Sequence, residues 1–323
     1  MLEDIKTYLG EDWDKVRKGI RAYLSTDIDL LGKTNRGLLG HSGKQLRPLL
    51  ALLVARACSG TVNENTVRFA IASELLHNAT LLHDDVADES DTRRGSPTVR
   101  ALLGSNASVL VGDFWLVKAM CAVLDGVGGQ DRVIRIFSGT LSDLAEGEML
   151  QLQKAALADT GEEDYFGIIA RKTASLFVAT SRSAAISVNV PENMEQAAAD
   201  FGKYLGLAFQ IRDDIFDYMP ESGIGKPVGV DIIEKKITLP LLCAFGNVGK
   251  DEERRIREKI KAGGEQVRDE VIAFVRENGG RQKAQEILEE YIDKAIEVTG
   301  VFPMSRDRDL LVSLAEALSN RMV

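Results

Sequence analysis

Two short acidic clusters have the residue types and the spacing to bind a divalent metal ion. The first is HDDVAD at residues 83–88 and the second is RDDIFD at residues 212–217, and both contain Asp-Asp-x-x-Asp. On a helix, side chains four positions apart lie on one face, so the first and last aspartates of each cluster point the same way. The candidate metal ligands are Asp84, Asp85, Asp88, Asp213, Asp214 and Asp217.

A hard metal ion would resolve the repulsion inside each cluster. Like charges four residues apart destabilise a helix unless a cation lies between them. Carboxylate oxygens without cysteine or histidine ligands suit Mg²⁺ or Ca²⁺, and the sequence contains no calcium loop of the EF-hand type. Mg²⁺ usually takes one or two carboxylates and completes its octahedron with water and phosphate oxygens. Two clusters that face each other across a bundle would therefore hold a diphosphate through several Mg²⁺ ions.

The alternative is that both clusters are solvated helix ends that bind nothing. Each cluster follows an apolar stretch that is typical of an inner helix, AIASELLHNATLLH before the first and FGKYLGLAFQI before the second. Carboxylates that end an inner helix are costly to bury without a counterion, so this context favours the metal site.

Basic residues elsewhere in the chain supply the opposite charges. The segment GKQLRP at 43–48 opens a predicted helix, whose free N–H groups and dipole favour an anion. Lys172 and Thr173 interrupt an otherwise apolar helix, and His77 lies two turns before Asp84 on the same helix face. Each alone is more simply a surface charge or a core histidine, but together they would counter the charges of two diphosphates. The basic candidates are Lys44, Arg47, Arg93, Arg94, Lys172, Lys226 and Lys236.

The elements that must position these residues are predicted to be helices. Apolar residues recur at three- and four-residue spacing, alternating strand patterns are scarce, and no glycine-rich phosphate loop or internal repeat is present. Segments 63–82 and 192–211 are apolar on nearly all sides, which is typical of helices at the centre of a bundle. We predict an all-α fold with a single domain over residues 1–323, a large helical bundle around a deep central cavity. The predicted helices cover residues 3–24, 44–58, 63–88, 97–126, 130–155, 162–188, 192–218, 234–246, 250–261, 265–278, 281–298 and 305–321.

Composition excludes several classes of protein. The 323 residues are 45% hydrophobic and 28% charged, with a net charge of −9, which is unlike a disordered chain or a generic nucleic-acid-binding protein. The strongest apolar run, residues 49–57, is broken by Arg56, and no run approaches the roughly 18 residues that a transmembrane helix needs. The N-terminus is acidic and lacks the apolar segment of a signal peptide. We therefore expect a cytoplasmic protein without a transmembrane segment.

Cysteine and histidine residues do not form a familiar redox or zinc motif. Cys58, Cys121 and Cys243 lie far apart without a CxxC pair, so we expect buried free thiols rather than a disulfide framework. The histidines show neither HxH nor HExxH spacing, which argues against a zinc site.

In its two aspartate clusters and their basic companions, the chain resembles the trans-isoprenyl diphosphate synthases, also called polyprenyl synthetases. The resemblance covers essentially the whole chain in matching order. It implies an all-α bundle around a deep cavity, usually a homodimer, that adds isopentenyl diphosphate to an allylic diphosphate head to tail with trans geometry. It also implies three Mg²⁺ ions around the bound diphosphate. The matching segments are GKQLRP (43–48), LLHDDVADESDTRRGSPT (81–98), GD (112–113), AEGEMLQ (145–151), KT (172–173), FQIRDDIFD (209–217), GKPVGVD (225–231) and EKKITLP (234–240).

The resemblance implies a role for each matching residue. The two aspartate clusters resemble the metal-binding motifs of the family, and the residues expected to be catalytic are Asp84, Asp85, Asp88, Lys172, Asp213, Asp214 and Lys226. The positions that correspond to the allylic diphosphate site are Arg93, Lys172, Thr173, Gln210, Lys226 and Lys236. Those of the isopentenyl diphosphate site are Lys44, Arg47, His77 and Arg94. Two departures are Gln45, where the family usually has arginine, and Lys235, where glycine is common.

Two small residues before the first cluster bear on product length. Ala79 and Thr80 precede Asp84 by about 6–7.5 Å along a helix, and Thr80 shares the face of Asp84. A large aromatic side chain there would block a growing tail near the cavity mouth. Small residues here resemble the long-chain members of the family, so we expect a product in the hexaprenyl to nonaprenyl range for quinone side chains, with octaprenyl favoured.

Four alternatives remain open. A shorter-chain synthase for farnesyl or geranylgeranyl diphosphate is disfavoured by the small pair Ala79 and Thr80. A terpene cyclase would not need the residues of an isopentenyl diphosphate site. A non-catalytic regulatory subunit could lose aspartates, whereas both clusters are complete here. A helical scaffold that merely binds Mg²⁺ would not explain lysines inside apolar helices.

Overall fold

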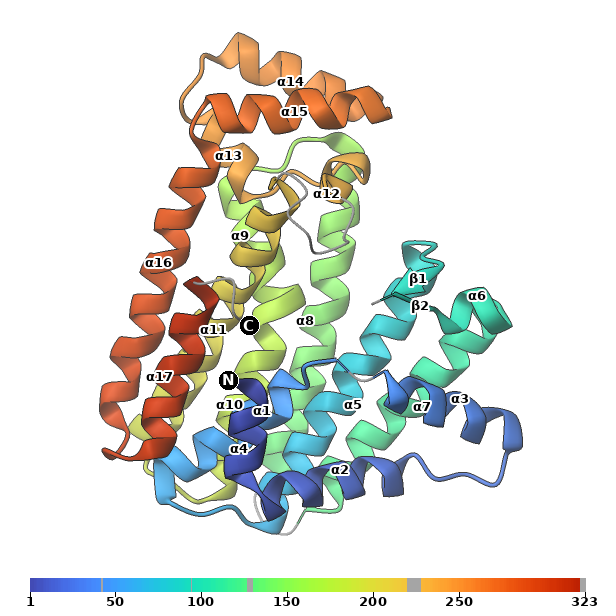
Figure 1. The fold of residues 1–323 in the computed structure, drawn as a ribbon, viewed down its shortest axis with the longest axis vertical. Helices are drawn as coiled ribbons and strands as arrows, with labels where there is room; N and C mark the ends of the chain where they lie inside the picture. Colours follow the sequence, from blue (N-terminus) through green and yellow to red (C-terminus); the bar gives the residue numbers. More distant parts are fainter. Residues whose placement is uncertain (42, 94, 127–129, 220–227, 320–323) are drawn as a thin grey trace. The chain divides into compact units, whose positions relative to one another are not determined.

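The computed structural model describes residues 1–41, 43–93, 95–126, 130–219 and 228–319. Within these ranges the chain is almost entirely helical, so the predicted all-α class is confirmed (Figure 1). The chain divides into two compact units, which comprise residues 1–138, 179–199 and 299–311, and residues 139–178, 200–298 and 312–323. The expectation of one domain around a deep central cavity stays a prediction.

The first unit is organised around two buried helices. Residues 49–55 of α4 are fully buried. Residues 69–76 of α5 are all at most 5% exposed, so this part of the predicted segment 63–82 lies in a core, as expected. Helix α5 packs along α7 (Figure 1). The helices and strands that lie wholly in this unit are α1 (Leu2–Leu9), α2 (Glu11–Tyr23), α3 (Asp29–Gly40), α4 (Leu46–Ser59), α5 (Glu64–Ala87), β1 (Thr92–Arg93), β2 (Ser96–Pro97), α6 (Val99–Leu103), α7 (Ser105–Leu124) and the 3₁₀-helix η2 (Thr299–Val301).

Glycines divide two of the predicted helices. Gly10 has φ 53° and separates α1 from α2 within the predicted 3–24 helix, and Gly104 has φ 86° and separates α6 from α7 within 97–126. Glycine adopts positive φ without the steric penalty that a side chain would cause. Helix α3 was not predicted, because its only buried residue is Asn35 and its apolar Leu30 is exposed.

Helix α7 corrects one expectation from the sequence. The helix Ser105–Leu124 is long and apolar enough, by length and composition, to cross a membrane. Its most apolar 18-residue window has a mean hydropathy of 1.7, and 39% of that window is buried. This helix is not an uninterrupted apolar run, because Asp113 and Lys118 lie within it. One such helix is weak support for a membrane span, since core helices of soluble proteins meet the same criterion.

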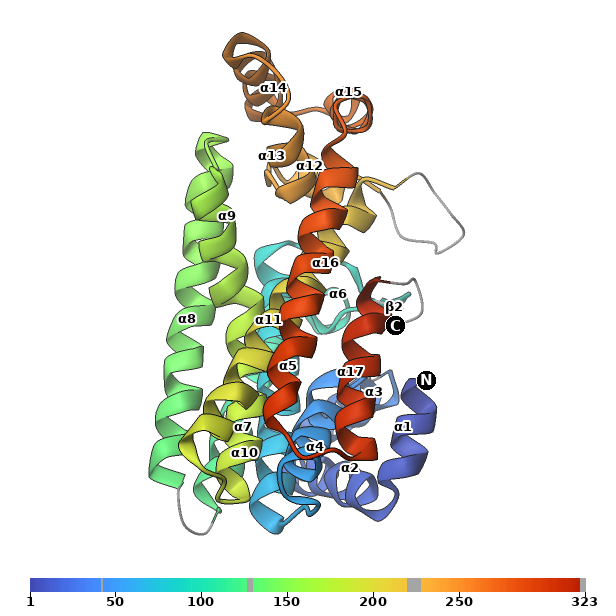
Figure 2. The same ribbon diagram turned by 90° about the vertical axis from the view of Figure 1, so that its left-hand side faces the viewer.

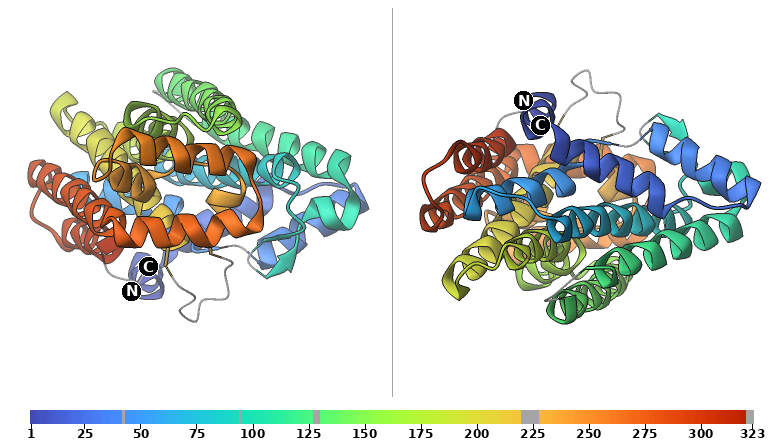
Figure 3. Two further views of the ribbon diagram at one scale, coloured as in Figure 1. Left: turned by 90° about the horizontal axis from the view of Figure 1, so that it is seen from above. Right: turned by 90° about the horizontal axis from the view of Figure 1, so that it is seen from below.

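The second unit begins with α8 from residue 139 onward, beside α9 (Figure 2). Its outer helices α14 and α15 lie side by side (Figure 3) and cover a small core that includes Tyr218 and Leu241. The remaining elements are α8 (Gln130–Leu157), α9 (Glu162–Ile169), the π-helical turn η1 (Ala170–Ala174), α10 (Ser175–Ser187), α11 (Glu192–Asp217), α12 (Val230–Ile233), α13 (Leu239–Phe245), α14 (Lys250–Ala262), α15 (Glu265–Glu277), α16 (Gly280–Val298) and α17 (Arg306–Ser319). The unit boundaries fall inside α8, α10, α11 and α17.

Two segments of the second unit differ from the predicted helices. The 162–188 helix contains the π-helical turn, a widening that apolar periodicity does not reveal. The predicted 234–246 helix begins only at Leu239, because Lys235 has φ 60° and Pro240 lies in the first turn. Proline disfavours helical geometry in the residue before it, so it marks a helix start rather than an interior.

Candidate active site

The first aspartate cluster lies at the C-terminal end of α5. Asp84 is half-buried and Asp88 is exposed, one helical turn apart on one face. Asp85 is only 4% exposed and accepts a 2.6 Å hydrogen bond from Nε of Arg93 in β1. Burial raises the pKa of Asp85, and the Arg93 guanidinium opposes this rise. Asp85 therefore differs from Asp84 and Asp88, because it is buried and ties α5 to the β-hairpin.

The predicted isopentenyl diphosphate residues that the structure describes lie at the start of α4 and within α5, in the same unit. Helix α4 begins at Leu46, directly after Gln45 with φ 54°, and no side chain caps its first turn. Lys44 is exposed just before this helix start, and Arg47 is buried within the first turn. His77 is half-buried in α5, two turns before Asp84. Arg94 lies outside the described residues.

The GD pair at 112–113 packs against the residue that precedes Asp84. A Cβ atom at Gly112 would lie 2.4 Å from Nε2 of His83, so a larger residue here would require the His83 ring to move. Nε2 of His83 lies 3.3 Å from Oδ1 of Asp113. The GD pair, which belongs to the resemblance without an assigned role, lies beside the first cluster.

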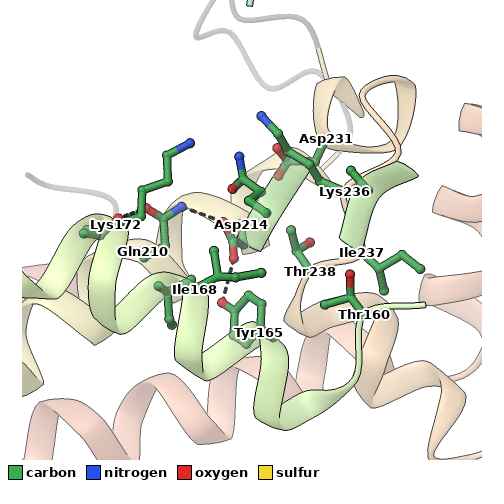
Figure 4. Close-up of a pocket in the computed structure, with 14 residues that line it drawn as sticks. Thr160, Tyr165, Ile168, Lys172, Gln210, Asp214, Asp231, Lys236, Ile237 and Thr238 are labelled. Atoms are coloured by element: carbon green, nitrogen blue, oxygen red, sulfur yellow. Dashed lines mark hydrogen bonds between the residues drawn. The ribbon is translucent and has the colours of Figure 1, made fainter. Parts of the chain in front are cut away.

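The second unit contains a cavity of about 120 Å³ (Figure 4). Its lining brings together the predicted allylic residues that the structure describes within this unit, and it includes Asp214 from the second cluster. Lys226 lies outside the described residues. The polar residues of the lining include Lys172, Thr173, Gln210, Asp214, Asp231 and Lys236.

A hydrogen-bonded chain holds Asp214 from both sides (Figure 4). The Tyr165 hydroxyl donates to Oδ2 of Asp214 over 2.6 Å, and Nε2 of Gln210 donates to Oδ1 over 2.8 Å. The Thr173 hydroxyl in turn donates to Oε1 of Gln210 over 2.7 Å. Burial, followed by the nearby Asp231 carboxylate, raises the pKa of Asp214 well above its ordinary value. Both oxygens of this aspartate already have protein donors.

Asp217 caps the short helix α12. Its Oδ1 and Oδ2 atoms accept hydrogen bonds of 3.0 Å from the backbone N–H groups of Val230 and Asp231. The N–H of Gly229, which has φ 75°, donates to the Asp217 carbonyl over 2.9 Å. Burial raises the pKa of the Asp217 carboxyl, and these backbone donors oppose the rise. Asp213 differs from the other two aspartates of the second cluster, because its side chain is 42% exposed. Its Oδ1 atom lies 3.2 Å from the Arg212 guanidinium.

Consecutive lysines after α12 point to different places. Nζ of Lys235 donates to the carbonyl of Lys261 at the end of α14 over 3.0 Å. Lys236 instead lines the cavity, and its backbone N–H donates to the Asp231 carbonyl over 2.7 Å. Burial, followed by the neighbouring Asp217 carboxylate, raises the pKa of Asp231 to about 7. The substitution of lysine for glycine at 235 therefore leaves Lys236 directed to the cavity.

Lys172 and Thr173 lie in the π-helical turn. The Lys172 ammonium pairs with Glu148 of α8, within the AEGEMLQ segment. Sequence reasoning missed Glu148, Tyr165 and Asp231 as parts of the site. The AEGEMLQ and GKPVGVD segments signalled two of them, whereas nothing local to Tyr165 indicates that it reaches an aspartate 49 residues away.

Among the described residues, no group of three or more histidine, cysteine or carboxylate side chains converges to hold a metal ion. Mg²⁺ binds through one or two carboxylates and takes phosphate and water oxygens as its other ligands. Asp84, Asp88 and Asp213 are the partly or fully exposed carboxylates of the two clusters.

The two residues predicted to influence product length have different surroundings. Ala79 is fully buried in α5. Thr80 is half-buried, and its hydroxyl donates to the His77 carbonyl over 2.8 Å. Their influence on product length stays a prediction.

The chain matches the family model for polyprenyl synthetase over residues 29–277. It is 38% identical over 318 residues to the octaprenyl diphosphate synthase of Haemophilus influenzae, covering 97% of this chain and 95% of that protein. It is 37% identical over 322 residues to the octaprenyl diphosphate synthase of Escherichia coli, covering 99% of both. A decaprenyl diphosphate synthase structure from Rhodobacter capsulatus has a TM-score of 0.93 at 33% identity, covering 100% of both chains. A polyprenyl synthase from Caulobacter crescentus, solved with calcium and isoprenyl diphosphate, has a TM-score of 0.91 at 31% identity, covering 100% of this chain and 98% of that one.

Proposed function

The chain belongs to the polyprenyl synthetase family and is a prenyltransferase, and from this premise we propose the reaction that its residues carry out. The chain joins isopentenyl diphosphate to an allylic diphosphate, head to tail and with trans geometry. Repeated condensation yields a long-chain polyprenyl diphosphate, with octaprenyl favoured. The names of the relatives and the small residues Ala79 and Thr80 support a long product over farnesyl or geranylgeranyl diphosphate.

One observation carries this proposal. The cavity of the second unit is lined by two lysines and by a hydrogen-bonded network in which the Thr173 hydroxyl binds Gln210, and the Gln210 amide binds Asp214. The ammonium groups of Lys172 and Lys236 would bind the oxygens of an allylic diphosphate, as would Arg93 and Lys226. The Thr173 hydroxyl and the Gln210 amide would orient it. Cationic groups aimed at a leaving group stabilise the negative charge that develops on it.

The six aspartates divide into two functional groups in this proposal. Asp84, Asp88 and Asp213 would bind Mg²⁺ directly, and the number of ions stays a prediction. Asp85, Asp214 and Asp217 hold neighbouring segments in place through the hydrogen bonds described above. Bound Mg²⁺ would neutralise charge on the departing diphosphate.

The protein side chains then govern binding and the exclusion of water. The allylic C–O bond breaks, the new C–C bond forms to isopentenyl diphosphate, and a proton leaves for the departing diphosphate, so no protein base is required. Lys44, Arg47, His77 and Arg94 would hold isopentenyl diphosphate so that its double bond meets the allylic carbon. Apolar walls protect the allylic cation from water.

We further propose a cytoplasmic homodimer. Helices α6 and α7 expose large apolar side chains, including Leu102 at 67% and Leu110 at 68%. Exposed apolar surface of this kind is typical of an interface between protein copies. A second copy over this face would account for the apolar character of α7 without a membrane.

The deciding experiment incubates purified protein with farnesyl diphosphate, labelled isopentenyl diphosphate and Mg²⁺, and resolves the products by length. A ladder that ends at a long polyprenyl chain is expected. A single short product would keep the family and overturn the long-chain proposal. No incorporation with several allylic primers would favour a regulatory subunit or a cyclase.

A further inference from the structure

The functional pair Lys172 and Thr173 lies in a π-helical turn, a rare backbone geometry. The turn Ala170–Ala174 is π-helical, and the Ser175 N–H donates to the Ala170 carbonyl five residues earlier. Such turns are rare, carry one extra residue, and occur frequently at functional sites. The Ser175 hydroxyl donates to the Arg171 carbonyl, which gives that carbonyl a partner within the turn.

Two glycines from different helices contact the backbone of this turn. A Cβ atom at Gly147 of α8 would lie 2.9 Å from the Lys172 nitrogen and 2.9 Å from Cβ of Arg171. A Cβ atom at Gly206 of α11 would lie 2.7 Å from Cα and 3.0 Å from Cβ of Ala174. Neither glycine has a positive φ, so the requirement for glycine is space and not backbone conformation. The atoms that would be struck are backbone or Cβ atoms, which have no rotamer to change.

Each glycine is followed on its own helix by a residue that binds a functional side chain of the turn. Glu148, next to Gly147, pairs with the Lys172 ammonium. Gln210, one helical turn after Gly206, accepts the hydrogen bond of the Thr173 hydroxyl at 2.7 Å. The close approach at each glycine therefore sets the distance at which its helix meets the functional side chain.

We propose that Gly147 and Gly206 are positioning residues that fix the π-helical turn, so that Lys172 and Thr173 meet the allylic diphosphate. This inference rests on the proposed function for the identity of the ligand. A methyl group at either position would displace the turn by part of an ångström or more. A misplacement of about 1 Å can cost on the order of 100-fold in rate, so the allylic side of the reaction should lose at least about tenfold.

The test compares Gly147→Ala and Gly206→Ala with Gly139→Ala. Gly139 is exposed, lies on α8 like Gly147, and has no atom within 4 Å of its ideal Cβ position. Two measurements are made: calorimetric binding of inorganic pyrophosphate with and without Mg²⁺, and the KM of each substrate. We expect the Kd for pyrophosphate and the KM for farnesyl diphosphate to rise at least about tenfold in the first two variants. The KM for isopentenyl diphosphate should stay within about twofold of wild type, as should every constant of Gly139→Ala.

Three outcomes would overturn the inference. One is a Kd for pyrophosphate in Gly147→Ala and Gly206→Ala that equals that of Gly139→Ala. Another is an equal rise in KM for both substrates. The third is loss of the native circular dichroism spectrum in both variants, because the clash would then not be confined to the turn. If wild-type protein incorporates no isopentenyl diphosphate but the pyrophosphate constants still separate, the proposed function fails while the positioning role stands.

Discussion

The Tyr165 hydroxyl donates a 2.6 Å hydrogen bond to Oδ2 of Asp214, the second aspartate of the Asp213–Asp217 cluster. Burial, together with the adjacent carboxylate, raises the pKa of Tyr165 well above its ordinary value, so the phenol remains a donor at any working pH. Because Gln210 donates to the other oxygen, Asp214 is oriented by the protein before any ligand binds. Asp214 therefore differs from its neighbour Asp213, whose side chain is 42% exposed.

Removal of the Tyr165 hydroxyl should expose this supporting role. Tyr165→Phe keeps the ring but leaves a buried carboxylate without one of its donors. The loss should lower stability by about 1–3 kcal/mol and lower kcat/KM for the allylic substrate by about tenfold or more. Tyr204→Phe, on the same helix as Asp214, is the matched control and should change neither quantity. Equal kinetics for the two variants would contradict the role.

Alanine substitutions at Asp213 and Asp217 should separate metal binding from helix capping. Asp213→Ala should raise the Mg²⁺ concentration for half-maximal activity at least about tenfold, because a metal ligand is lost. Asp217→Ala should leave that concentration near wild type and lower stability by about 1–2 kcal/mol, because the cap of α12 is lost. The check is a Mg²⁺ titration of each variant together with thermal unfolding. A Mg²⁺ requirement that rises equally in both would refute the division.

The Asp231 carboxyl should make the stability of the metal-free protein depend on pH. Its pKa is about 7 in the folded protein against an ordinary 3.8, so the native state binds the proton more firmly than the unfolded state does. The contribution of Asp231 to stability is therefore greatest at low pH and falls as the pH rises from about 4 to about 7. Asp231→Asn removes this loss and should stabilise the metal-free protein at pH 8 by roughly 1–3 kcal/mol, with little difference near pH 4.

Denaturant unfolding across this pH range provides the check on Asp231. Asp269→Asn is the control, since Asp269 lies on α15 in an exposed pair with Arg268. Its stability difference from wild type should not follow the same curve. A constant difference between Asp231→Asn and wild type at all pH values would exclude Asp231 as the source.

A larger side chain at Thr80 should shorten the product. Thr80→Tyr places an aromatic ring about 6 Å along α5 from Asp84, on the same face. The chain-length distribution, measured by mass spectrometry of the dephosphorylated products, should shift to shorter chains. Thr80→Val preserves the size of the side chain and should leave the distribution as in wild type. An unchanged distribution in the tyrosine variant would contradict a role in length control.

The sequence by itself determined the helical class and the positions of the two aspartate clusters, because these depend on local spacing. A repeat of three or four residues reports which side chains share a helix face, and it correctly paired Asp84 with Asp88. The same repeat did not reveal α3, whose buried side chain is the polar Asn35. It also gave no sign of the π-helical turn around Lys172, which depends on contacts with two other helices.

Only the tertiary structure decided which groups form hydrogen bonds with each aspartate. Asp84 and Asp85 look equivalent in the sequence, but Asp85 is buried against Arg93. Asp213 and Asp214 look equivalent too, but Asp214 meets Tyr165 from a helix far away in the chain. Hydrogen bonding and desolvation set the charge and orientation of a carboxylate, and both are properties of the groups that folding brings around it. Helix spacing alone does not contain that information.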